Sequence, residues 1–153
     1  MAISPNVDFT SGQILTATQQ NQFPRGIVAY KQETAASGAI GAEAVQLIST
    51  TFTAVANRYY KITYFEPKLS ASLNGNQCTQ RIRLTNISGT VLQTSYMQPN
   101  TANFVMNICQ VVTTFAAGST VVVGTLQMGG TNVFAGRSAT EIGLLVVEDI
   151  GPA

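Results

Sequence analysis

The feature that most constrains this chain is a series of short β-prone segments that begins near Gly26 and continues almost to the end. The segments are rich in Val, Ile, Thr, Tyr and Phe, and Gly, Asn, Ser or Pro separates each from the next. Strands are predicted at residues 27–33, 44–53, 58–65, 77–85, 91–97, 104–115, 120–128 and 142–148. This spacing, without a long helical pattern, predicts an all-β fold, an eight-stranded antiparallel jelly-roll sandwich.

The first 24 residues differ from the rest and are predicted to form an N-terminal docking arm, with the jelly roll over residues 25–153. Thr16 and Gln19 have the spacing of a capping box for one short helix, which Pro24 ends. The arm has too little apolar surface to hold itself to a core, so we expect it to gain order on another protein. Its candidate docking residues are Phe9, Ile14, Leu15, Thr16, Gln19 and Phe23.

Composition narrows the class of partner. Charged residues make up 10% of the chain, against roughly 25% in typical soluble domains, and the net charge is +1. Such a chain has no strong electrostatic field to attract nucleic acid or an acidic membrane. Its low net charge also gives little repulsion between copies, which favours an assembled state. The start has no pattern of a signal peptide, so we expect assembly in a reducing cytoplasm. Cys78 and Cys109 are then expected to be buried thiols. A disulfide between them is the alternative if their strands are neighbours.

Catalysis is poorly supported by the residues present. The chain has no histidine, which removes the commonest general base and metal ligand. Glu148 and Asp149 are adjacent at the end of the last predicted strand and are expected to point to opposite faces, so they cannot form a paired-carboxylate site unless the strand bends there. Glu66 lies at a predicted strand end. We therefore expect no enzymatic activity, no cofactor and no metal; a structural Ca²⁺ held by these carboxylates is the less favoured alternative.

Two predicted strands carry apolar residues on both faces, at 121–123 and 144–147. A strand in a two-layer sandwich should alternate, so an outer apolar face indicates cover by another subunit. The candidate trimer-interface residues are Tyr60, Tyr64, Val122 and Leu145.

The tyrosines and arginines on other predicted strands each allow two interpretations. The tyrosines favour core or interface packing over glycan stacking, since tryptophan is absent. Arg81 and Arg83 alternate with an apolar inner face that starts at Cys78 and includes Ile82. They favour interface salt bridges over an anion site.

Four stretches resemble segments of small virion structural proteins of tailed bacteriophages, especially those of actinobacterial hosts. They are FTSGQILTATQQN at 9–21, PRGIVAY at 24–30, FTAVANRYYK at 52–61 and VEDIGPA at 147–153. The resemblance implies a short trimeric jelly roll of the C1q/TNF-like kind. The family includes head decoration or minor capsid proteins and also minor tail proteins.

The resemblance and the composition together predict a non-enzymatic virion structural protein. The leading hypothesis is a homotrimeric head decoration protein that binds the major capsid protein through its arm. The alternative is a minor tail protein at the tail tip or fibre base, with possible binding of host glycans. In both cases the partners are other copies of the chain and a capsid or tail protein, and the location is the virion.

Overall fold

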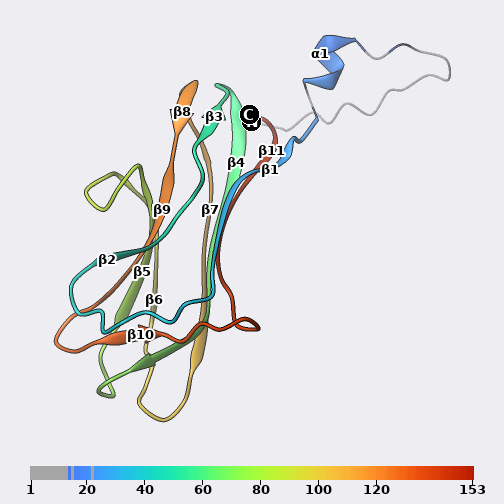
Figure 1. The fold of residues 1–153 in the computed structure, drawn as a ribbon. Coiled ribbons are helices and arrows are strands. Elements are labelled where there is room, and N and C mark those ends of the chain that lie inside the picture. Colours follow the sequence, from blue (N-terminus) through green and yellow to red (C-terminus); the bar gives the residue numbers. More distant parts are fainter. Residues whose placement is uncertain (1–13, 15, 22) are drawn as a thin grey trace.

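The structure, a computed structural model, describes residues 14, 16–21 and 23–153. Two antiparallel sheets face each other as a sandwich (Figure 1). Sheet A contains β1 (Gly26–Glu33), β4 (Arg58–Ala71), β7 (Val105–Thr114), β10 (Val133–Ala135) and β11 (Gly143–Pro152). Sheet B contains β2 (Ala44–Ile48), β5 (Cys78–Leu84), β6 (Val91–Met97) and β9 (Val122–Met128). A two-stranded sheet pairs β3 (Phe52–Ala54) with β8 (Gly118–Thr120), and a single helical turn, α1 (Ala17–Gln20), precedes β1.

The order of pairing is that of a jelly roll. Leaving aside the three-residue strands, the first strand pairs with the last (β1 with β11) and the second with the last but one (β2 with β9). The third then pairs with the sixth (β4 with β7) and the fourth with the fifth (β5 with β6). This nested pairing is what results when one long antiparallel hairpin rolls up into two sheets.

The strand count is higher than predicted, with eleven strands in the described part of the chain rather than eight. The segments at 44–53 and 120–128 each divide in two, because each crosses between sheets and cannot pair continuously. β10 has only three residues and was not predicted. β4 runs beyond its predicted end and through Pro67. Its pairing with β7 shifts between Glu66 and Leu69, so the proline does not need to donate a ladder hydrogen bond.

Alternation along the strands sets the core between the two sheets. In β4 the inward side chains from Arg58 to Glu66 are buried and the residues between them are partly exposed. In β5 Gln80 and Ile82 are buried, and Arg81 is partly exposed, which confirms the predicted inner face. The sheets approach closely at Gly124, where an added Cβ would lie 2.8 Å from the ring of Tyr64. A side chain at this position would therefore push the sheets apart.

The two cysteines belong to this core. Cys78 and Cys109 are free and buried, as predicted. Burial raises the pKa of Cys78 to about 12, and it also raises the pKa of Cys109. Both thiols therefore behave as small apolar side chains and not as nucleophiles. Among the described residues, no helix is long and apolar enough to cross a membrane.

Candidate functional site

The base of the N-terminal arm is held by a buried ion pair. Arg58, at the start of β4, donates to both carboxylate oxygens of Asp149 in β11, at 2.6 and 2.7 Å. Both side chains are almost fully buried, with 4% and 1% exposure. The same guanidinium donates to the backbone carbonyl of Phe23 at 2.6 Å and to that of Asn21. The backbone between α1 and β1 is thus fixed to the sheet by a charge that itself has a buried partner.

Beyond this base, the described part of the arm is exposed. α1 stands beside the body of the sandwich, at the end where the C-terminus lies (Figure 1). Ile14 is 87% exposed and Phe23 is 39% exposed, and Thr16 is exposed too. Phe9 and Leu15 lie outside the described residues, as does the side chain of Gln19. The role of these residues in docking stays a prediction.

The predicted trimer-interface residues were wrong. Tyr60, Tyr64, Val122 and Leu145 each have 1% exposure or less within a single chain, so no second subunit can reach them. All four point into the sandwich. Tyr60 packs against Phe52 and Phe115 and accepts a hydrogen bond from the amide of Val55 at 2.8 Å. The burial of Tyr60 and Tyr64 also removes them from any glycan-stacking surface.

An apolar surface does exist on the opposite side of the same strands. We call it the outer face of sheet A. Phe65 in β4 lies between Leu144 in β11 and Ile108 in β7, and one row further on Val146 in β11 lies beside Tyr30 in β1. It consists of Ile27, Tyr30, Phe65, Met106, Ile108, Val112, Leu144 and Val146. The sequence had indicated a covered outer face at residues 144–147 but not its continuation into β1 and β7.

The charges at the middle of this face are already neutralised. Lys61 Nζ lies 2.8 Å from Glu148 Oε2, and each side chain is about one third exposed. Lys61 and Glu148 are cross-strand neighbours in the pairing of β4 with β11. The centre of the face therefore carries no net charge that would repel an identical surface.

A polar cluster on the outer side of sheet B is paired within the chain. Arg83 forms two hydrogen bonds with Glu43, at 2.7 and 2.8 Å, and Arg81 lies 3.0 Å from the same carboxylate. Thr125 also donates to Glu43, at 2.6 Å. The predicted role of both arginines in salt bridges between subunits was therefore wrong, because their partner is Glu43 of the same chain.

This cluster has a consequence for stability in acid. Burial opposes the ionisation of Glu43, but the hydrogen bonds from Arg83 and Thr125 and the charge of Arg81 outweigh it and lower the pKa of Glu43 to about 2, from 4.5. A lowered folded-state pKa stabilises the fold above pH 4.5, and this contribution is lost as the pH falls toward 2. We expect Glu43→Gln to lower the free energy of unfolding at pH 7 by about 1–2 kcal/mol after allowance for solvent screening.

The measurement is urea denaturation of both proteins at several pH values. The loss caused by Glu43→Gln should shrink between pH 4.5 and 2, the interval in which Glu43 becomes protonated. Glu141→Gln is the control, because Glu141 pairs with Lys68 at 3.4 Å on a more exposed surface. A difference between Glu43→Gln and the parent protein that does not change with pH would contradict the assignment.

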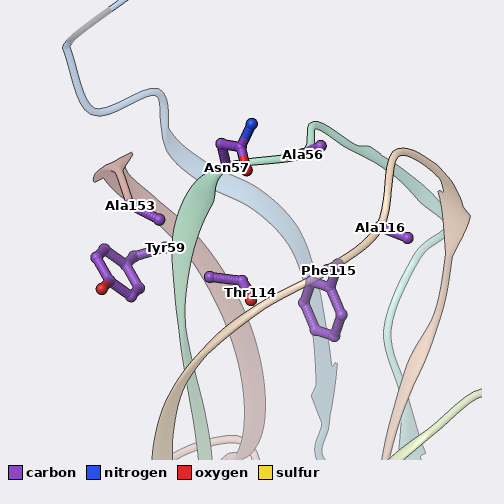
Figure 2. A pocket seen from close by; sticks show the side chains of 7 residues that line it. All are labelled: Ala56, Asn57, Tyr59, Thr114, Phe115, Ala116 and Ala153. Carbon is purple, nitrogen blue, oxygen red and sulfur yellow. The ribbon is translucent and has the colours of Figure 1, made fainter.

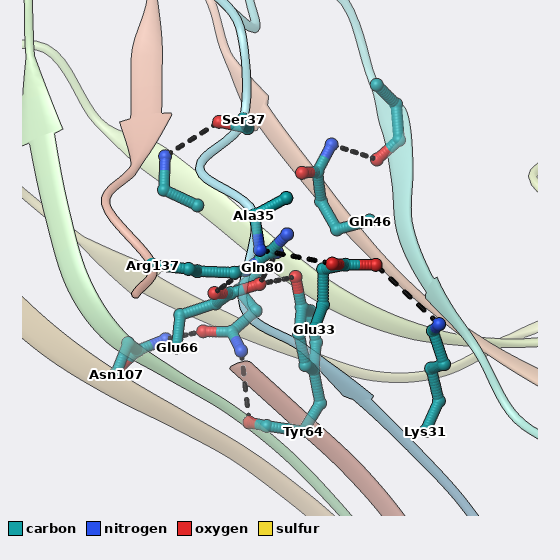
Figure 3. A network of polar contacts seen from close by, with 12 residues as sticks. Lys31, Glu33, Ala35, Ser37, Gln46, Tyr64, Glu66, Gln80, Asn107 and Arg137 are labelled. Carbon is teal, nitrogen blue, oxygen red and sulfur yellow. Dashed lines mark hydrogen bonds and ion pairs between the residues drawn. The ribbon is translucent and has the colours of Figure 1, made fainter. Parts of the chain in front are cut away.

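A second polar cluster lies inside the sandwich (Figure 3). Arg137 donates to both carboxylate oxygens of Glu66, and Tyr64 Oη donates to Glu66 Oε1 at 2.6 Å. Gln80 donates to the carbonyl of Tyr64 at 3.0 Å, and Asn107 bridges Gln80 and Ser95. Glu66 was predicted to lie at a strand end, but it lies inside β4 with 0% exposure. Arg137 was not predicted as its partner.

The pocket at one end of the sandwich does not have the chemistry of an active site. A pocket of about 480 Å³ lies at the arm end of the sandwich (Figure 2). Its lining residues are Ala56, Asn57, Tyr59, Thr114, Phe115, Ala116 and Ala153. These provide no carboxylate, thiol or amine side chain. Within the described residues, no group of three or more His, Cys, Asp or Glu side chains could hold a metal ion.

No protein-family model and no curated protein matches the sequence. Among solved structures, the CBM22-1 xylan-binding domain of Paenibacillus barcinonensis Xyn10C has 9% identity and a TM-score of 0.35, over 81% of this chain and 87% of that one. A CBM4 structure has 17% identity and a TM-score of 0.27, over 82% and 92%. The structure of infectious bursal disease virus Gx strain has 13% identity and a TM-score of 0.23, over 84% of this chain and 39% of that one. The jelly-roll assignment rests on the strand pairing of this chain itself.

Proposed function

We propose that this chain is a non-enzymatic structural protein of a phage virion, a homotrimer that decorates and stabilises the head through its N-terminal arm. The observation that carries the proposal is the contrast within the arm. Its base is fixed by the buried pair of Arg58 and Asp149, whereas Ile14 beyond it is 87% exposed. A fixed base that presents an exposed apolar side chain suits a docking element, because little order is lost at the base on binding.

Two further observations support this function. The sequence resembles small virion proteins in its arm and in residues 52–61 and 147–153. The second and third of these stretches meet in the structure, where Arg58 contacts Asp149 beside the arm. Part of the resemblance therefore lies around the arm base. A minor tail protein is the alternative location, and the arm would then dock on a tail protein.

The test is the copy number of the chain in particles of the phage that encodes it, by quantitative mass spectrometry against the major capsid protein. We expect many copies in a fixed ratio to the capsid protein. A small multiple of three per particle would contradict the head location and move the protein to the tail. Absence from the particles would contradict the virion assignment altogether.

The same particles test the arm. Removal of residues 1–20 keeps Asn21 and Phe23, whose carbonyls bind Arg58. We expect the shortened protein to be folded, with an unchanged oligomeric state, but to be lost from particles when it replaces the full-length chain. Full occupancy by the shortened protein would show that the arm is not the docking element.

A further inference from the structure

We propose that the outer face of sheet A joins copies of this chain head to tail, so that the β7 side of one copy packs on the β1–β11 side of the next. This inference rests on the homotrimer of the proposed function and identifies its interface. The two sides lie at opposite edges of sheet A. The strands β1 and β11 form one side, and β4 and β7 form the other.

The exposed apolar surface on the outer face of sheet A is large for a monomer. Five of its side chains are more than half exposed: Ile27 63%, Tyr30 53%, Met106 68%, Ile108 52% and Val112 52%. With Phe65, Leu144 and Val146, the exposed apolar area is on the order of 600 Å², since large side chains have roughly 150–250 Å² each. This is at the upper end of the largest patch on a typical monomer, about 300–600 Å². A head-to-tail contact uses one side from each copy, so about half of this area faces each of two neighbours.

The two sides of the face have complementary shapes. On the β1–β11 side, a shallow pocket of about 520 Å³ is lined by Ile27, Tyr30, Gln32, Leu144 and Val146. On the β7 side, Met106, Ile108 and Val112 project from one face of an edge strand as a largely apolar row, which Gln110 interrupts between Ile108 and Val112. An apolar row on one edge and an apolar pocket on the other are the two halves of a contact between identical molecules.

The row cannot fill the pocket of its own chain. Tyr30 pairs with Val146, Val146 with Thr63, and Thr63 with Gln110 beside Ile108, so three strand spacings separate the two sides. At about 4.8 Å per spacing, the separation is roughly 14 Å. In the proposed contact, the pocket receives the row of another copy. A head-to-tail contact of this kind closes into a ring when the rotation between copies permits it, and a trimer is such a ring.

Electrostatics also favours a second copy as the occupant. Lys61 and Glu148, at the middle of the face, neutralise each other within the chain. A partner of strong charge would find no complementary charge here, whereas an identical neutral face meets no repulsion. The long β7 edge strand, which would promote aggregation if left open, would be covered in the ring.

The experiment is a charge-complementation test read out by light scattering after size exclusion. Ile108→Lys and Tyr30→Glu each place a charge at one side of the contact. We expect each single variant to raise the trimer dissociation constant by on the order of 100-fold or more, because the charge is buried unpaired. The double variant I108K/Y30E should recover most of the trimer, since each lysine then meets a glutamate of the next copy.

Two controls make the result specific. I108K/Y30K carries like charges and should stay dissociated. Tyr96→Glu changes an equally exposed tyrosine, at 61%, on the edge strand β6 of sheet B, and should leave the trimer intact. Circular dichroism verifies the fold of each variant.

The outcomes separate this interface from the proposed function. A trimer that withstands both single substitutions would overturn the interface and leave the homotrimer in place. The single variants could also dissociate while I108K/Y30E forms no more trimer than I108K/Y30K. That result would show that the two sides do not meet and would also overturn the proposed interface. A monomeric parent protein would overturn both the interface and the homotrimer, while the virion assignment would still be decided by copy number in particles.

Discussion

Arg137→Ala is expected to lower the free energy of unfolding by about 3–5 kcal/mol, because it leaves the buried carboxylate of Glu66 without its cation. Glu66 has 0% exposure and Arg137 has 8%. Burial opposes the charge of Arg137, but the hydrogen bond and the charge of Glu66 outweigh it and raise the pKa of Arg137. Burial, followed by the charge of Glu66, raises the pKa of Tyr64 as well, so its hydroxyl remains a donor to the carboxylate.

Equilibrium denaturation in urea measures the change. Lys61→Ala is the matched control, since it removes a cation from a partly exposed pair and should cost about 0–1 kcal/mol. Removal of the whole cluster, in Y64F/E66M/R137M, should recover most of the loss, because no buried polar group is then left without a partner. A cost below about 1 kcal/mol for Arg137→Ala would show that water or another group compensates Glu66.

Space for this ion pair is provided by a glycine in β11. A Cβ added at Gly143 would lie 2.5 Å from Arg137 Nε and 3.1 Å from Glu66 Oε2. The guanidinium therefore occupies the volume that any side chain at this position would need. The glycine that begins β11 is thus part of the same polar cluster.

The local pattern of the sequence was sufficient to predict the class of fold, but it did not predict which charged residues would form ion pairs. Alternation of apolar and polar residues located most strands and the inner face of β5, because the side-chain period of a strand is a local property. Arg58 and Asp149 are 91 residues apart, and Glu66 and Arg137 are 71 apart. Which of these charges meet depends on the pairing of β4 with β11 and on the loop before β11, and neither is encoded in a nearby pattern.

The main error in the predicted site was the assignment of apolar side chains to the inner or outer face of the sheet. Leu144 to Val147 were correctly read as apolar on both faces, yet Leu145 was chosen for the interface and its neighbour Leu144 was not. Parity along a strand says that adjacent residues point to opposite sides, but it does not say which side is the core. The answer comes from the partner strands. Leu145 lies beside Tyr64 of the core, and Leu144 lies beside Phe65 of the outer face.

The adjacent leucines of β11 give the second large expected effect. Leu145→Asp should prevent folding, whereas Leu144→Asp should give a folded protein that no longer forms the proposed trimer. Leu145 has 0% exposure, so the substitution loses core packing and buries an unpaired charge, at a cost of about 5 kcal/mol or more. This is comparable with the whole stability of a typical domain, about 5–15 kcal/mol.

Leu144 is partly exposed within the chain and lines the pocket on the β1–β11 side. Aspartate at this position stays hydrated in the monomer and would become buried only in the proposed contact between copies, so its cost should fall on association and not on folding. Circular dichroism, thermal unfolding and light scattering of the two variants distinguish these effects. A Leu144→Asp protein that unfolds would place this side chain in the core, and one that remains trimeric would place the interface elsewhere. The two substitutions are identical in chemistry and one residue apart, so any difference between them reports the face of the sheet to which each side chain belongs.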